Sequence, residues 1–308
     1  MGSQFIPTRV TDRGSKAIGE VRMAMARLTA RAVAFKILRP RLALAVVALT
    51  LAPAPCASLL GQSVQQGIGG GGESPLRITV RSGFSYQDLS FASDAPGANV
   101  LLSVERPRAW SVWAGFDYVN KFDDSAPGYR MGGSYWASGS TVLTLTIEVA
   151  PKQIVVPRQA YTVQISRIMP HRLVPALGYR FADYATADVH MIMPEVTWYF
   201  SRFYWLVRYY LAATAFGGQN TTTHSAFTRV YWSVTDPVTV SAGYVRANES
   251  FESGNPADPF AGFSANHVLL GVDWDIWTDT GIGAAFDYEK RNDGSTLRRY
   301  DIRMFYRW

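Results

Sequence analysis

The sequence predicts an all-β fold: a transmembrane antiparallel β-barrel of about 14 strands, with 12 as the lower bound. Segments of about ten residues alternate apolar and polar side chains, which is the pattern of a strand with two different faces. The connections between these segments are alternately short and long. The chain also carries 9 Trp and 16 Tyr, and many of them stand near the segment ends.

Each strand is predicted from its own alternation. In one segment, for example, Trp110, Val112 and Ala114 alternate with Ser111 and with polar residues further on. About ten residues per strand suffices for a tilted crossing of a bilayer. The predicted strands are, in chain order, 76–86, 100–105, 110–118, 129–137, 143–148, 161–166, 173–182, 187–200, 205–211, 225–234, 238–247, 266–277, 281–290 and 297–308.

The lengths of the connections favour a membrane barrel over a soluble sandwich, because short and long loops do not usually alternate so regularly in a soluble sandwich. Outer-membrane barrels have tight periplasmic turns and longer outer loops. The short connections are 107–108, 138–140, 169–172, 201–203, 235–237 and 278–280. The long ones are 89–98, 120–128, 151–159, 183–186, 217–224, 248–265 and 291–296. Pro194 is expected to mark a bulge, and the hairpin over 129–150 is rich in glycine; both leave the strand count between 12 and 14.

The basic charge of the chain comes from its first part. The formal charge is +6, but residues 1–57 hold nine Lys and Arg against two acidic residues, which leaves 21 basic and 22 acidic groups elsewhere. A basic stretch followed by the apolar run 42–51 and small residues at 53–58 predicts a signal peptide. We therefore expect a removed leader at 1–57, a Gly-rich periplasmic linker at 58–75 and a barrel at 76–308, and no nucleic acid as partner.

Aromatic residues near the strand ends predict an interfacial girdle, because their rings combine an apolar body with a polar edge. The expected girdle residues are Trp110, Trp198, Tyr199, Trp205, Trp232, Trp274, Trp277 and Trp308. Core packing in a soluble sandwich is the alternative. The last strand, Tyr300 to Trp308, ends on an aromatic residue and resembles the C-terminal signal of bacterial outer-membrane barrels. That resemblance implies the bacterial outer membrane as location, its lipid as partner, and contact of this strand with the barrel assembly machinery.

Polar residues of the alternating strands are expected to face the lumen and to line a path for a substrate. They are Arg81, Glu105, Asp117, Glu148, Arg180, Glu195, Arg208, Tyr210, Arg229, Asp273, Asp287 and Arg303. Two interpretations remain open. The charges either pair to hold the barrel wall or form a polar conduit for sugars or ions. Inward aromatic residues such as Trp113, Trp136, Tyr210 and Tyr231 are suited to stacking on sugar rings.

No motif predicts an enzyme, a metal site or a cofactor. His224, Ser225 and His267 fall at the same outer side, but a nucleophilic site also needs them within hydrogen-bond reach of one another. His224 is expected in an outer loop. The run GIGGGG at 67–72 precedes no helical pattern and indicates a flexible linker rather than a phosphate loop.

One stretch is more specific. It comprises LGYRFADY at 177–184, Asp188 to His190, Pro194, VTWYF at 196–200 and RYYL at 208–211. These residues resemble the YaiO family of outer-membrane barrels, which has a similar GYRY run followed by strands rich in aromatic residues. The resemblance implies a non-enzymatic conduit or accessory in polysaccharide export or surface assembly. A general or small-solute porin is the alternative, and a hydrolase at the outer rim is the third hypothesis.

Overall fold

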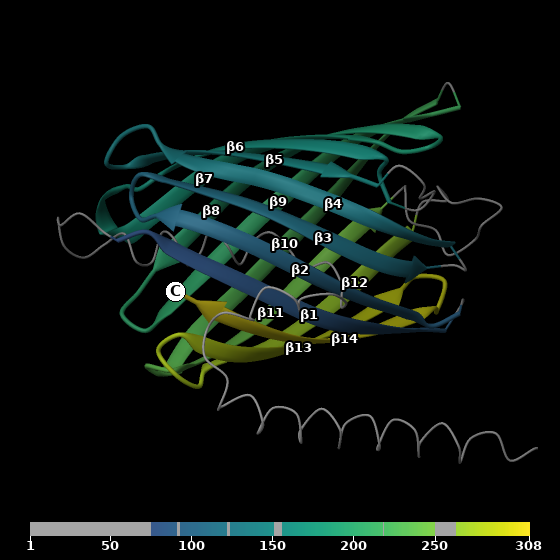
Figure 1. Cartoon of the computed structure of the whole chain (residues 1–308). Helices are drawn as coiled ribbons and strands as arrows, with labels where there is room; N and C mark the ends of the chain where they lie inside the picture. Colours follow the sequence, from purple (N-terminus) through teal and green to yellow (C-terminus); the bar gives the residue numbers. More distant parts are fainter. Residues whose placement is uncertain (1–74, 91–92, 122–123, 151–155, 218, 250–262) are drawn as a thin grey trace, which may run out of the picture. The chain divides into compact units, whose positions relative to one another are not determined.

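The strands close into one barrel. The computed structural model describes residues 75–308 except 91–92, 122–123, 151–155, 218 and 250–262. Each strand pairs antiparallel with the next along the chain, and the first strand also pairs with the last, so that the sheet has no free edge (Figure 1). Closure satisfies every strand edge, which is the condition for crossing a membrane with β-structure. The expected leader 1–57, its signal peptide and nearly all of the linker 58–75 lie outside the described residues.

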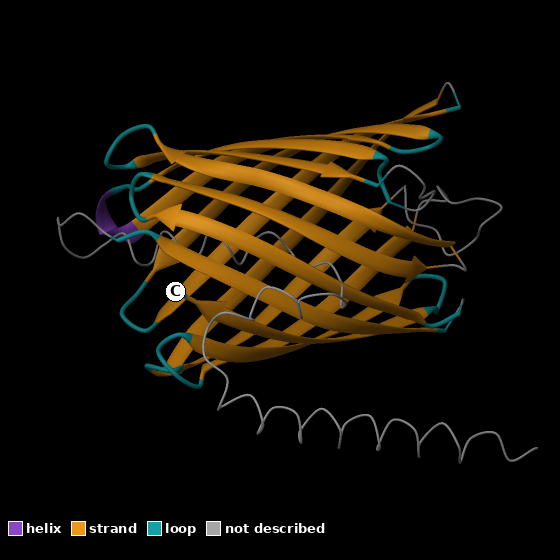
Figure 2. Cartoon of the chain, in the orientation of Figure 1, coloured by secondary structure: helices purple, strands orange, loops and turns teal. Residues whose placement is uncertain are grey.

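The barrel has 14 strands, which confirms the predicted fold class and the upper value of the predicted count (Figure 2). They are β1 (Arg77–Leu89), β2 (Ala95–Arg106), β3 (Trp110–Lys121), β4 (Asp124–Trp136), β5 (Thr141–Val149), β6 (Gln159–Arg167), β7 (Leu173–Asp183), β8 (Ala187–Tyr199), β9 (Phe203–Phe216), β10 (Gln219–Thr235), β11 (Val238–Glu249), β12 (Phe263–Asp275), β13 (Thr280–Arg291) and β14 (Thr296–Arg307). A short 3₁₀ turn at Pro170–Arg172 joins β6 to β7. Among the described residues, no helix is long and apolar enough to cross a membrane.

Several hairpins extend further at the loop end than the sequence predicts. The β9–β10 ladder continues to the pair Phe216 and Gln219, so the expected loop 217–224 is mostly strand. His224 therefore lies within β10 and not in a loop, which corrects the prediction. Thr221 to Thr223 favour an extended backbone, and their partners on β9 continue the ladder beyond the apolar part of the wall.

Pro194 does not produce the expected bulge. The β8–β9 register is the same on both sides of it, with Ile192 opposite Leu211 and Glu195 opposite Arg208. On its other side Pro194 pairs with Leu177 of β7. Proline lacks a backbone N–H, so it interrupts the ladder locally without inserting an extra residue.

The two faces of the barrel wall differ in polarity. Outward positions carry exposed apolar side chains, such as Val112, Ile302 and Met304, of which Ile302 is 65% exposed. Inward positions carry buried polar side chains, including Gln87, Asn99 and others. This distribution of apolar and polar side chains is the reverse of that in a soluble protein. It is the arrangement expected where the outer face contacts lipid and the inner face encloses a polar lumen.

Aromatic residues mark both rims of the outer face. At the turn end, the Trp residues of the predicted girdle are all exposed. Tyr199 is different, since it is 5% exposed and lies on the inner face, so its assignment to the girdle was wrong. At the loop end, outward tyrosines meet polar partners through their hydroxyl groups. These pairs are Tyr86 with Asp94, Tyr179 with His190 at 2.7 Å, Tyr209 with His224 at 2.6 Å and Tyr244 with Asn266 at 2.5 Å.

Candidate functional site: the inner wall of the barrel

The ladder register places all twelve predicted lumen residues on the inner face. Residues that lie opposite each other on paired strands share a face of the sheet. One inward row runs from Gly83 through Arg303 and Gly283 to Asp273. The same reasoning puts Arg81, Glu105, Asp117, Glu148, Arg180, Glu195, Arg208, Tyr210, Arg229 and Asp287 on this face.

At least seven of these residues form arginine–carboxylate ion pairs along the wall. Arg208 of β9 pairs with Glu195 of β8, where the carboxylate is buried. Two other arginines reach across an intervening strand. The Arg180 guanidinium lies 2.6 Å from Glu148 Oε2 on β5, and it donates at 3.3 Å to Thr162 of β6 on the way. Such pairs tie together strands that share no ladder.

The pair of Arg303 and Asp273 shows how the backbone makes room for this reach. Arg303 Nη2 donates to Asp273 Oδ1 at 2.7 Å and to Oδ2 at 2.8 Å, over β13. Gly283 lies between them in the same inward row. A Cβ there would stand 2.6 Å from Arg303 Nε, so the bridge depends on the absence of a side chain.

Asp117 completes the paired set, with a partner that the sequence analysis did not select. Arg130 of β4 donates to Asp117 Oδ1 at 2.6 Å and is 9% exposed. Tyr129 and Met131 on either side of it are outward and apolar. Their alternation would have marked Arg130 as inward, but the glycines of this hairpin obscured the pattern.

A second group of charges lies at the loop end of the lumen. His267 Nδ1 is 3.5 Å from Asp287 Oδ1, and its Nε2 is 3.9 Å from Glu289. Arg291 Nε donates to Glu289 at 2.5 Å. Both members of that last pair are buried. The sequence predicts both Asp287 and Glu289 on the inward face of β13, and Asp287 belongs to the predicted path.

An aromatic stack lines the turn end of the wall on β8, β9 and β10. The rings of Tyr199 and Tyr204 are 5.3 Å apart, and those of Tyr204 and Tyr231 are 4.4 Å apart and nearly parallel. The Arg229 guanidinium lies 4.9 Å from the Tyr231 ring, and its Nη2 donates to Ser241 at 2.8 Å. The three rings are buried, so the stack is a packed part of the wall.

Further along the same strands, Arg208 contacts both a tyrosine hydroxyl and a carboxylate. Its Nη1 donates to the Tyr210 hydroxyl at 3.4 Å, while its other nitrogens face Glu195. Tyr204, Arg208 and Tyr210 occupy inward positions on one strand, over a length of roughly 20 Å at about 3.4 Å per residue. We call Tyr199, Tyr204, Tyr231, Arg229, Arg208, Glu195 and Tyr210 the tyrosine–arginine track.

Trp113 and Trp136 also lie on the inner face, on β3 and β4. The Trp113 ring covers Gly132, where an added Cβ would be 2.6 Å from ring atoms. Arg81 and Glu105 lie inward on the neighbouring strands β1 and β2, towards the turn end. The inner wall thus carries aromatic side chains on two separate sectors.

The residues considered for a rim hydrolase do not come together. His224 points outward and bonds Tyr209, whereas Ser225 and His267 are on inward positions of different strands. Ser225 Oγ instead accepts the Asn248 N–H at 3.1 Å. Within the described part of the chain, no group of three or more His, Cys, Asp or Glu side chains is placed to hold a metal ion.

Comparison with known proteins gives one family and several barrels of similar shape. The model of the YaiO membrane beta barrel domain matches residues 77–246, more than half of the chain. No curated protein matches the chain in sequence. Similar solved structures include Pseudomonas aeruginosa OpdQ (9% identity, TM-score 0.46), which aligns over 76% of this chain and 98% of its own.

Two further structures have comparable scores. An anion-selective porin from Comamonas acidovorans is 10% identical with a TM-score of 0.45, over 76% of this chain and 99% of its own. The translocator domain of the autotransporter NalP from Neisseria meningitidis is 13% identical with a TM-score of 0.40, over 82% of this chain and 96% of its own. None of these likenesses supports an argument about the function of the chain.

Proposed function

The chain belongs to the YaiO membrane beta barrel family and is a protein of the bacterial outer membrane, and on this premise we propose that it acts in the export or surface assembly of polysaccharide. Its role is that of a non-enzymatic conduit or accessory, whose inner wall contacts the saccharide. No catalytic step or cofactor is part of the proposal.

The tyrosine–arginine track is the observation that carries this proposal. Saccharides present many hydroxyl groups around rings with apolar faces. Tyrosine offers an apolar body with a polar tip, and arginine offers several donors in a fixed plane. On β9, Arg208 and Tyr210 occupy successive inward positions, and Arg208 joins Tyr210 to Glu195. Arg208 and Tyr210 are the members of the track that are not buried, so these two can exchange hydrogen bonds with a passing chain without holding one sugar tightly.

The test compares two adjacent tyrosines that differ in the face they occupy. Tyr210 points into the lumen, and Tyr209 points outward to His224. Deletion of the gene is expected to lower cell-surface and secreted polysaccharide, and the intact protein should restore it. Tyr210→Ala should restore it poorly, whereas Tyr209→Ala, the matched control, should restore it fully if both fold equally well. Unchanged polysaccharide after deletion would refute the proposed role.

A general or small-solute porin is the second candidate, favoured by the ion pairs along the lumen. Paired arginine and carboxylate groups such as Arg303 with Asp273 create local fields that sort small ions. Planar-bilayer conductance of the purified barrel distinguishes the two roles. Steady conductance together with unchanged polysaccharide in the deletion strain would favour the porin.

We also propose that β14 is recognised by the barrel assembly machinery. The outward side chains Tyr300, Ile302, Met304 and Tyr306 alternate along this strand and are exposed, as is Trp308 directly after it. Trp308→Ala is expected to slow the appearance of folded barrel in the membrane. A matched change at another exposed turn-end residue, Trp277→Ala, should leave the rate unchanged; equal rates for both variants would contradict this proposal.

A further inference from the structure

Basic side chains gather on the outer face at the loop end of β11 to β14. Arg246 lies opposite Asn266, which in turn lies opposite Lys290, so these three outward positions form one row. Arg298 of β14 lies opposite Tyr288, one step nearer the middle of the wall. Arg298 pairs with Asp88 at 3.3 Å, whereas no carboxylate of the described residues pairs with Arg246 or Lys290. Within the described residues, this row therefore carries positive charge that no carboxylate pairs with.

Local hydrogen bonds orient the row. Asn266 Oδ1 accepts from the Tyr244 hydroxyl at 2.5 Å and from Arg246 Nη1 at 2.9 Å. The guanidinium is thus held along the wall by a neutral partner, and its remaining donors stay available. An arginine that is oriented in advance loses less rotamer freedom when it binds an anion.

The outward strand positions elsewhere on the described rim lack this charge; Arg158, in the connection before β6, is exposed and donates to the Ala185 backbone oxygen at 3.0 Å. On β1 to β9, the described outward positions near the loop end are neutral or acidic apart from His190, and they include Asp88, Asp183 and Asp188. The positive sector is therefore confined to about a third of the circumference. A general attraction to a charged membrane surface would not require such confinement.

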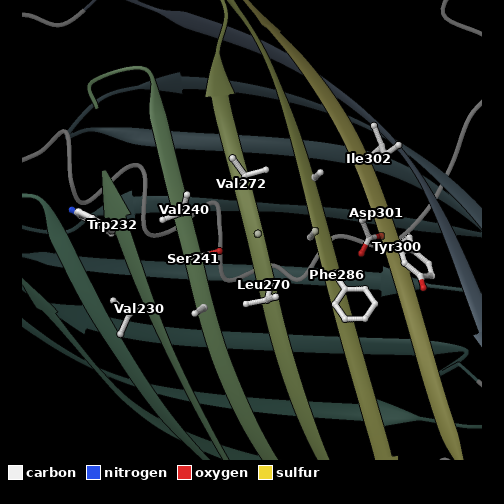
Figure 3. Close-up of a pocket in the computed structure, with 14 residues that line it drawn as sticks. Val230, Trp232, Val240, Ser241, Leu270, Val272, Phe286, Tyr300, Asp301 and Ile302 are labelled. Atoms are coloured by element: carbon white, nitrogen blue, oxygen red, sulfur yellow. The ribbon is translucent and has the colours of Figure 1, made fainter. Parts of the chain in front are cut away.

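A shallow apolar hollow lies on β10 to β14, nearer the turn end than this sector. Figure 3 shows residues that line it. The hollow has a volume of about 780 Å³. Two outward rows form it, and the small side chains Ala242 and Ala284 provide its depth between larger neighbours such as Leu270 and Phe286. The row nearer the loop end contains Ala242, Leu270 and Phe286. Arg298 lies about 7 Å from this row along its strand, and Arg246 and Lys290 lie about 14 Å from it.

We propose that this face binds one anionic lipid of the outer leaflet, a phosphorylated and multiply acylated glycolipid of the lipid A class. Arg246 and Lys290 would bind a phosphate, and the hollow would receive an acyl chain. The order of the two features along the strands, charge at the rim and hollow beneath it, matches the order of headgroup and chain in such a lipid. This site is on the opposite face of the wall from the track and does not depend on the proposed function.

The test measures lipid binding to the full barrel in detergent by native mass spectrometry, with bisphosphorylated lipid A and its dephosphorylated form as probes. The charge variant is Arg246→Gln with Lys290→Gln. The matched control is Arg167→Gln with Arg202→Gln, which removes two exposed arginines at the turn end. At about fivefold per basic residue near a membrane surface, the charge variant should bind the phosphorylated probe about 25-fold more weakly. The control should bind it as the wild type does.

A second variant tests the hollow without changing charge. Ala242→Phe with Ala284→Phe fills it from outward positions, where larger side chains meet lipid and not the lumen. Because each buried methylene contributes about fourfold to lipid binding, both probes should bind several-fold more weakly. All variants are first checked for the wild-type barrel spectrum by far-ultraviolet circular dichroism.

Three results of the binding measurements would overturn the proposal. They are equal affinity of the wild type for the two probes, unchanged affinity in the charge variant, and an equal loss in the turn-end control. A lipid-free dimer that dissociates when the hollow is filled would instead assign this face to a second copy of the chain, and would overturn the proposal as well.

Discussion

Substitution of Gly283 by alanine should loosen the wall between β12 and β14. The added Cβ would stand 2.6 Å from Arg303 Nε and 3.0 Å from its Cγ, and real Cβ atoms do not approach a neighbour as closely as the first of these. Arg303 must therefore move, and the three hydrogen bonds that it donates to Asp273 are lost or lengthened. The new methyl group would not be relieved by lipid, because position 283 faces inward.

The size of the effect follows from the exposure of the pair. Arg303 and Asp273 side chains are 26% and 32% exposed, so the pair is intermediate between a surface pair and a buried one. Surface pairs contribute about 0.2–1 kcal/mol, and breaking a buried pair costs about 3–5 kcal/mol. We expect Gly283→Ala to lower the free energy of unfolding by about 1–3 kcal/mol, which includes the steric displacement.

The assay is reversible denaturant unfolding of the barrel in lipid vesicles, followed by tryptophan fluorescence. Gly139→Ala is the control, since a Cβ at position 139 would meet nothing within 4 Å, and it should change stability by less than about 0.5 kcal/mol. In an Asp273→Asn background the effect of Gly283→Ala should shrink, because the charged bridge is already gone. A Gly283→Ala barrel as stable as the Gly139→Ala barrel would refute the reasoning.

Three further predictions concern other parts of the wall. Gly132→Ala should lower stability by about 1–3 kcal/mol in the same unfolding assay, because the added Cβ would stand 2.5 Å from the Leu145 backbone oxygen and 2.6 Å from the Trp113 ring, and both must shift; an unchanged ring environment in near-ultraviolet circular dichroism would contradict it. Arg208→Ala should cost about 3–5 kcal/mol by leaving the buried Glu195 carboxylate unpaired, and adding Glu195→Gln should recover part of the loss. In the outer loop 292–295, the Ser295 hydroxyl and N–H donate to Asp293 at 2.6 and 2.8 Å and hold the pKa of that carboxyl below its ordinary value. Its contribution to stability is therefore present at neutral pH and lost as the pH falls through the folded-state pKa, and Ser295→Ala should raise the pKa in an NMR titration.

The face of each residue could be predicted from the sequence, but its partner could not. Alternation is a local property, and it placed Arg180 and Glu148 on the inner face correctly. Their contact depends on the stagger of β5, β6 and β7 around the barrel, which no single segment encodes. The position of Arg130 was missed because glycines diluted the alternation around it.

Aromatic residues show the limit of the same reasoning. A tyrosine near a strand end suits the membrane interface and the lumen equally well. Tyr199 follows Trp198 directly, so one of the two had to face inward, and the register to Tyr204 shows that it is Tyr199. Strand ends at the loop side were also set too short, since polar residues such as Thr221 continue the ladder where the sequence suggests a loop.

The ladder between β1 and β14 is the seam at which the sheet closes into a barrel. The other thirteen ladders join strands that follow one another along the chain, whereas the seam joins residues more than 200 positions apart, such as Asp88 and Arg298. Bringing such distant segments together costs about 3 kcal/mol more loop entropy than closing a tight hairpin. The wall can therefore form hairpin by hairpin as a curved sheet, and only the pairing of its first and last strands closes that sheet into a barrel. The seam is also where we expect the wall to part first under denaturant, with Ile78 and Trp308 exchanging their amide protons before the hairpins do.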